Sequence, residues 1–107
     1  MSSERDEVTN SVIVADAPAA RRYEVRVDGR VAGFAAYRLV QGRIIFTHTE
    51  ISPEFEGRGF GSRLAAGALD DVRSRGLLVT PLCPFIAAYI ERHPAYADLV
   101  SRPPEGR

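Results

Sequence analysis

The feature that most constrains this fold is a glycine-rich turn, Glu56-Gly57-Arg58-Gly59-Phe60-Gly61, between a strand pattern and a helix pattern. The first amides of a helix lack partners within the helix, and the helix dipole adds positive potential there, so an anion fits. Glycines let its oxygen atoms approach the backbone, and Arg58 can add a charge-assisted hydrogen bond. The turn therefore predicts an anion site. Its spacing also fits an ordinary turn that allows close packing of strand and helix.

Two familiar phosphate-binding motifs are excluded. The turn has no Gly-Lys-Ser/Thr sequence, so it is not a P-loop. It also lacks the G-x-G-x-x-G pattern and the later acidic residue of a dinucleotide-binding Rossmann fold.

The remaining patterns predict an α+β (α/β) domain of order β-β-β-α-β-α. The three leading strands form an antiparallel meander, and the strands on either side of the first helix should be parallel. A further short strand at Val12 to Val14 is interrupted by Asp16-Ala17-Pro18. The predicted strands are 23–27, 31–40, 43–51 and 77–82, and the predicted helices are 59–74 and 85–93.

Length and composition limit the alternatives. The 107 residues suit one domain, 11–100, with flexible ends at 1–10 and 101–107. Arginines number 14, acidic residues also 14, and lysine is absent, so nothing demands a nucleic acid or membrane partner. A single cysteine, Cys83, excludes an internal disulfide and argues against a structural zinc site, and we expect no metal. The polar N-terminus favours the cytoplasm, and we expect a monomer or weak homodimer.

The segment Ile51-x-Pro53-x-x-Glu56-x-x-Gly59-x-Gly61-x-x-Leu64 resembles the signature of the GNAT acetyltransferase superfamily. That signature reads Val/Ile-x-Pro-x-x-Arg/Gln-x-x-Gly-x-Gly/Ala before a helix, so Glu56 departs from it. The resemblance implies a mixed sheet, mostly antiparallel with a splayed parallel pair, and acetyl-CoA as cofactor. It also implies which residues bind acetyl-CoA: the strand end at Ile51, and the turn residues Gly57, Arg58, Gly59, Phe60, Gly61 and Ser62.

The chain is similar to one branch in particular, the GNAT-like proteins of about a hundred residues. The matching pieces lie within residues 23–100 and are His48-Thr49-Glu50-Ile51, the glycine-rich turn, Pro81-Leu82-Cys83-Pro84-Phe85, Tyr89 and His93-Pro94. Members of this branch lack the N-terminal helices with which larger GNATs shape the acceptor site. The identity of the acceptor amine therefore stays open.

Four residues are candidates for catalysis. Cys83 precedes a helix, which favours a thiolate, and the resemblance makes it a candidate nucleophile; the alternative is a small buried residue beside the cofactor. His48 and Glu50 share one strand face, and both could line the cleft, where either could be the general base. The alternative is a hydrogen-bonded His next to a solvent-facing Glu. Tyr89 resembles the GNAT tyrosine that protonates the CoA sulfur, although it could equally be core packing.

The leading prediction is an acetyl-CoA-dependent N-acetyltransferase that acts on an amine of a small molecule or a protein. One alternative is a non-catalytic CoA-binding module that acts as a sensor or partner subunit. Another is a structural α/β domain without CoA, which Glu56 alone favours.

Overall fold

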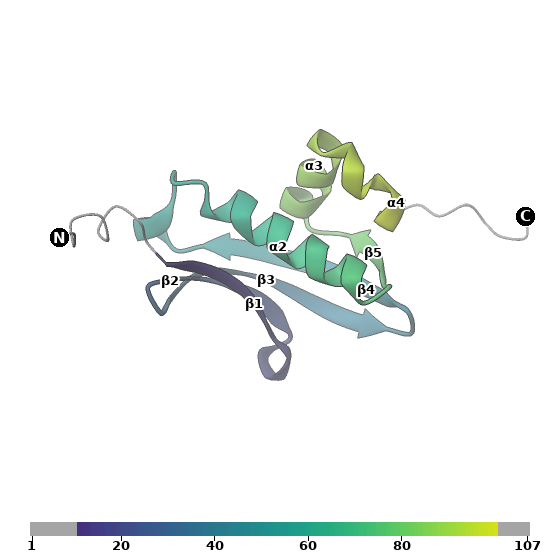
Figure 1. Ribbon diagram of the computed structural model, residues 1–107, viewed down its shortest axis with the longest axis horizontal. Coiled ribbons are helices and arrows are strands. Elements are labelled where there is room, and N and C mark those ends of the chain that lie inside the picture. The colour runs from purple at the N-terminus through teal and green to yellow at the C-terminus, as the bar shows by residue number, and fades with distance from the viewer. Residues whose placement is uncertain (1–10, 101–107) are drawn as a thin grey trace, which may run out of the picture.

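The computed structural model describes residues 11–100, so the predictions for 1–10 and 101–107 fall outside the described residues. Five strands form one sheet in sequence order (Figure 1). They are β1 (Val12–Ala17), β2 (Arg22–Val27), β3 (Arg30–Val40), β4 (Arg43–Ile51) and β5 (Leu78–Pro81). The helices are α2 (Phe60–Ser74), α3 (Pro84–Arg92) and the single-turn α4 (Ala97–Val100).

The pairing of the strands confirms the predicted mixed sheet. β1 to β4 are antiparallel neighbours, whereas β4 and β5, which α2 connects, are parallel. The long strand β3 lies at the centre of the sheet, which fits the apolar residues on both of its faces.

Two details of the predicted order were wrong. The first strand does not end at Val14 but continues through Asp16 to Ala17, which adds a fourth strand before α2. Asp16 stays in the strand because its carboxylate accepts hydrogen bonds from side chains on other elements. The chain also adds α4 after Pro94, where the prediction had only the end of a helix.

The core lies between the sheet and α2, which runs across one sheet face (Figure 1). The buried residues of α2 are Phe60, Leu64, Ala65, Ala68, Leu69 and Val72. The helix lies especially close to β1 at Gly67, where an added Cβ would be 2.7 Å from Cβ of Val14.

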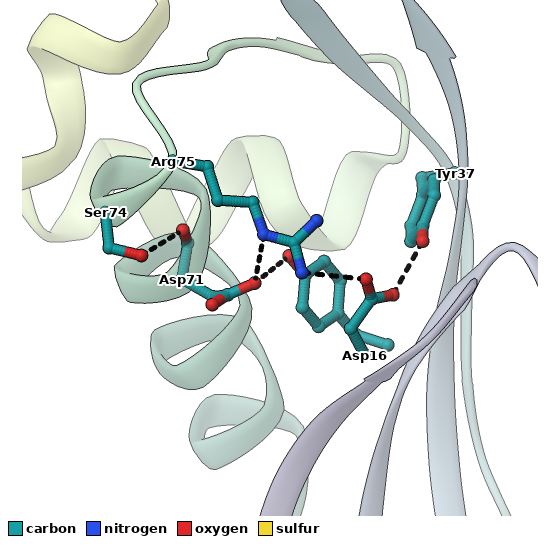
Figure 2. Close-up of polar contacts among 6 residues, drawn as sticks. Asp16, Tyr37, Asp71, Ser74 and Arg75 are labelled. Atoms are coloured by element: carbon teal, nitrogen blue, oxygen red, sulfur yellow. Dashed lines mark hydrogen bonds and ion pairs between the residues drawn. The ribbon is translucent and has the colours of Figure 1, made fainter.

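A polar cluster fastens the C-terminal end of α2 to the sheet (Figure 2). Arg75 lies 2.9 Å from a carboxylate oxygen of Asp16 and 3.0 Å from one of Asp71. Tyr37 donates a 2.6 Å hydrogen bond to Asp16, and Tyr23 donates one of 2.6 Å to Asp71. Asp16 and Asp71 are therefore both paired, and these contacts hold the C-terminal end of α2 against the sheet.

Candidate functional site

A one-residue bulge in β4 decides which side chains face α2. Tyr37 pairs with Phe46, but the preceding residue Ala36 pairs with His48, so Thr47 is an extra residue in β4. Such a bulge bends its strand and increases the local twist. Pairing of β4 with β5 ends at the same point, at Phe46 opposite Pro81. Beyond it, β4 is paired only with β3 as it runs toward the glycine-rich turn, and its other edge has no pairing with β5.

A pocket of about 340 Å³ lies where three segments meet: the part of β4 that is not paired with β5, the glycine-rich turn and the start of α2. Its walls come from four segments of the chain and include both apolar side chains and exposed backbone. The ten lining residues are Thr49, Ile51, Phe55, Glu56, Gly57, Gly59, Phe60, Gly61, Ser62 and Phe85.

The backbone of the turn explains two of its glycines. Gly57 and Gly59 have φ angles of 80° and 83°, in the left-handed region that glycine enters without a steric penalty. Gly59 is also the N-cap of α2, and its carbonyl accepts the helix bond from Arg63 at 3.2 Å. The amides of residues 60–62 precede that bond, so they have no partner within the helix and are free to bind an anion.

The third glycine is explained by packing instead. An added Cβ at Gly61 would lie 2.9 Å from Cζ of Phe85, the second residue of α3. The small residue therefore lets α3 approach the start of α2 and lets the Phe85 ring form one wall of the pocket.

The pocket brings together six of the seven residues predicted to bind the cofactor, namely Ile51, Gly57, Gly59, Phe60, Gly61 and Ser62. Arg58 is not among its walls; its guanidinium carbon lies 5.9 Å from the centre of the Phe55 ring. Glu56, which departs from the GNAT signature, does line the pocket and is exposed.

Cys83 and Thr49 meet beside the pocket. The Cys83 side chain is buried, with the residue only 2% exposed, and it is not part of the pocket wall. Its Sγ lies 3.1 Å from Oγ1 of Thr49, which does line the pocket. The Cys83 amide donates to the carbonyl of Phe46 at 2.9 Å, which holds the start of α3 against β4.

His48 and Glu50 lie on the sheet face away from α2. Glu50 pairs with Phe34 across the sheet, whereas its neighbour Thr49 belongs to the row that contains Tyr23, whose hydroxyl contacts α2. The two side chains form an exposed pair, with Nε2 of His48 2.7 Å from Oε2 of Glu50. They share a strand face, as predicted, but neither lines the pocket.

Tyr89 is buried in α3 and is also absent from the pocket wall. Its ring stacks on His93 with centroids 4.0 Å apart. His93 is the C-cap of α3, and its Nδ1 lies 2.9 Å from the Tyr89 carbonyl oxygen. Both side chains thus contribute to the end of α3.

Within residues 11–100, no group of three or more His, Cys, Asp or Glu side chains could hold a metal ion. None of the helices there is long and apolar enough to cross a membrane.

Comparison with known proteins identifies the family. A model of GCN5-related N-acetyl-transferases matches residues 22–99. The NATD1 proteins of Mus musculus and Homo sapiens are 33% identical to this chain over 76 residues, 69% of its length. That stretch covers 69% of the mouse protein and 67% of the human protein.

The chain belongs to the GCN5-related N-acetyltransferase family.

The fold of this GNAT domain has a solved counterpart. The NMR solution structure of a GCN5-like protein from Staphylococcus aureus matches it with a TM-score of 0.63 and 20% sequence identity. The match covers 87% of this chain and 91% of that one. These findings confirm the predicted GNAT-type acetyltransferase domain and its fold.

Thr49, Phe55 and Phe85 are the pocket residues that sequence reasoning missed in this GNAT domain. Thr49 was overlooked because strict alternation along the strand places His48 and Glu50 on the face of Phe46, and only the bulge at Thr47 reverses this. Phe85 had a usable signal, since its position just after Cys83 belongs to the segment that matches the short GNAT branch.

Proposed function

We propose that this protein is an acetyl-CoA-dependent N-acetyltransferase that acts on an amine of a small molecule or a protein. The observation that carries the proposal is the pocket between the end of β4, the glycine-rich turn and the start of α2. Family membership supports the class of reaction. Because the chain contains no lysine, any lysine acceptor belongs to another molecule.

The turn suits the pyrophosphate of acetyl-CoA on physical grounds. An added Cβ at Gly57 or Gly59 would meet nothing within 4 Å, so the backbone there is open to a ligand. The unpartnered amides of residues 60–62 and the helix dipole supply hydrogen bonds and positive potential. In this proposal those amides hold the pyrophosphate.

The rest of the pocket suits the pantetheine arm and the acetyl end. Thr49 and Ile51 lie on β4, before the glycine-rich turn in the chain. They belong to the stretch where β4 has no pairing with β5. Backbone groups on this edge can hydrogen-bond an extended amide chain, as an added strand would. Acetyl-CoA supplies an activated thioester there, and the protein binds it, orients it and partly shields it from water.

The remaining expectations follow the same reasoning. We propose a cytoplasmic monomer or weak homodimer that acts without a nucleic acid or membrane partner. The balance of 14 basic and 14 acidic residues supports the absence of a nucleic acid or membrane partner, since no large excess of charge attracts either kind of surface.

One observation favours a second candidate, a CoA-binding module without catalysis. None of the four predicted catalytic residues lines the pocket, and within residues 11–100 the only ionisable side chain that does is Glu56. A protein of this kind would bind acetyl-CoA and leave it intact.

The binding site is tested with substitutions at one glycine. Asn and Asp both tolerate the left-handed conformation of Gly59 and have nearly the same shape, but only Asp carries a negative charge, and only Asn has N–H donors. We expect Gly59→Asp to weaken acetyl-CoA binding, measured by calorimetry, by about tenfold or more relative to Gly59→Asn, through repulsion of the pyrophosphate. Equal affinity in the two variants would reject the pyrophosphate assignment.

Two further variants complete the binding test. Gly42 has a φ angle of 73° and an equally open surrounding, but it lies in the β3–β4 turn. Gly42→Asp should therefore leave acetyl-CoA affinity unchanged. Glu56→Gln should raise the affinity, because it removes a negative charge from the pocket wall.

Catalysis is tested by release of the CoA thiol in the presence of a panel of primary amines and peptides. Transfer predicts amine-dependent release together with an acetylated product detected by mass spectrometry. Tight acetyl-CoA binding with no product for any amine would favour the non-catalytic module.

A further inference from the structure

Thr49 stands between the pocket and the thiol of Cys83. Its hydroxyl lies 3.1 Å from Sγ, and Thr49 itself forms part of the pocket wall. It lies two residues before Ile51, which places it about 7 Å farther from the glycine-rich turn along β4. Among the wall residues contributed by β4, Thr49 is therefore the one farthest from the anion site.

Burial favours one direction of the Thr49–Cys83 hydrogen bond, in which either atom can donate. Cys83 is 2% exposed, and Thr49 Oγ1 is the hydrogen-bond partner of its Sγ among the described residues. Because a buried donor is normally satisfied, the favoured arrangement has the S–H group donating to Oγ1. The hydroxyl has one proton of its own, which this arrangement leaves for an acceptor in the pocket.

We propose that Thr49 donates a hydrogen bond to the thioester carbonyl oxygen and that Cys83 is its positioning partner rather than a nucleophile. This inference rests on the proposed function, because it assigns a role at the same pocket. Burial of Cys83 supports it, since a nucleophilic sulfur must reach the thioester carbon, whereas Thr49 already forms part of the pocket wall.

The chemistry balances without an enzyme-bound acetyl group. The amine nitrogen bonds to the thioester carbon, the carbon–sulfur bond breaks, and the proton lost by the amine ends on the CoA sulfur. The products are an amide and a thiol. Thr49 stabilises the carbonyl oxygen while that oxygen gains negative charge, and it keeps its proton throughout.

The direct test uses acetyl-CoA labelled with ¹³C at the thioester carbonyl and observed by NMR when bound. A hydrogen bond from Thr49 should move this resonance downfield relative to free ligand. Thr49→Val, which keeps the shape but removes the hydroxyl, should abolish the displacement, and Thr49→Ser should restore it. An identical bound resonance in the wild type and in Thr49→Val would overturn the proposal.

Kinetics and mass spectrometry separate Cys83 as a positioning partner from Cys83 as a nucleophile. Thr49→Val should lower kcat by about 100- to 1,000-fold, as loss of one donor to a developing oxyanion does, with little change in acetyl-CoA affinity. Cys83→Ser retains a donor to Thr49 and should keep kcat within about threefold. Loss of turnover in Cys83→Ser, or an acetyl group on Cys83 in the intact wild-type protein, would overturn the positioning role.

Failure of this inference is distinguishable from failure of the proposed function. If the wild type does not bind acetyl-CoA, both fall. If it binds and transfers acetyl groups while Thr49→Val behaves like the wild type, only the role of Thr49 falls.

Discussion

Tyr37 on the central strand donates a 2.6 Å hydrogen bond to the carboxylate of Asp16 on β1. Burial, and to a lesser extent this hydrogen bond to Asp16, raises the pKa of Tyr37 to about 12. The same carboxylate binds Arg75 at the C-terminal end of α2 (Figure 2). The tyrosine thus connects the sheet centre to the cluster that fastens the helix.

Alkaline pH should destabilise the protein through this phenol. An unfolded tyrosine titrates near pH 10, whereas folded Tyr37 keeps its proton to about pH 12. The contribution to stability is therefore complete below about pH 10 and is lost as the pH rises through 12, a loss of about 1–3 kcal/mol. Urea unfolding from pH 8 to 11.5 should show the onset of this decline.

Tyr37→Phe should make the alkaline decline shallower. It should also cost about 1 kcal/mol at neutral pH, because one hydrogen bond to Asp16 is lost. Tyr23 and Tyr96 also have raised pKa values, both mainly because of burial, so part of the decline should remain. The same slope in Tyr37→Phe and the wild type would contradict the prediction.

Acidic pH should destabilise the protein through Glu24, which is buried between Arg22 and Arg26 on the other sheet face. The hydrogen bond from Arg26 chiefly lowers the Glu24 pKa, burial opposes it, and the Arg22 bond adds to the lowering. Its stabilisation is present above the unfolded pKa, near 4.3, and is lost as the pH falls through the folded value. Glu24→Gln should cost about 1–3 kcal/mol at pH 7 and flatten the acid limb of the stability curve.

Glu54 provides the control for Glu24. It also pairs with an arginine, Arg30, at 2.6 Å, but both side chains are mostly exposed. Glu54→Gln should change the free energy of unfolding by less than about 1 kcal/mol. Equal losses in the two variants would mean that burial of Glu24 has no energetic consequence.

Gly67→Ala should destabilise the protein although alanine is the better helix former by about 1 kcal/mol. The new Cβ would lie 2.7 Å from Cβ of Val14, close to the β1 backbone, and overpacking of this kind costs about 1–3 kcal/mol. Thermal unfolding should show a lower Tm, and a second substitution, Val14→Ala, should restore part of it. A higher Tm in Gly67→Ala would show that α2 can move away from β1.

Gly61→Ala should cost less than Gly67→Ala. Its Cβ would meet the tip of the Phe85 ring at 2.9 Å, and that residue is 37% exposed, so the ring can shift outward. The same displacement changes a wall of the pocket, so acetyl-CoA affinity should fall although stability changes little. Calorimetry and thermal unfolding of the same variant separate the two effects.

Deletion of Thr47 should preserve the fold and impair acetyl-CoA binding. The strand pairs on both sides of the bulge can form without this residue, but β4 would lose the bend located where its pairing with β5 ends. Thr47→Ala keeps the extra residue and should bind normally. Full affinity in the deletion variant would show that the bulge does not shape the pocket.

The proposed anion site could be located from the sequence because its determinants are local. The left-handed turn at Gly57 and Gly59 and the free amides at the start of α2 depend on residues adjacent in the chain. For the same reason, six of the seven predicted binding residues do line the pocket. The antiparallel meander and the parallel connection across the helix likewise follow from patterns that are local in the chain.

Tertiary structure decided which side chains line the β4 side of the pocket. Whether Thr49 or His48 faces α2 depends on the register between β3 and β4, which contains an extra residue that no period-two pattern reveals. The contact of Cys83 with Thr49 joins residues 34 positions apart and exists because the start of α3 packs against β4. The sequence by itself determined the glycine-rich turn and the unpartnered amides at the start of α2, because these depend on neighbouring residues, and long-range strand pairing determined which side chains lie beside them.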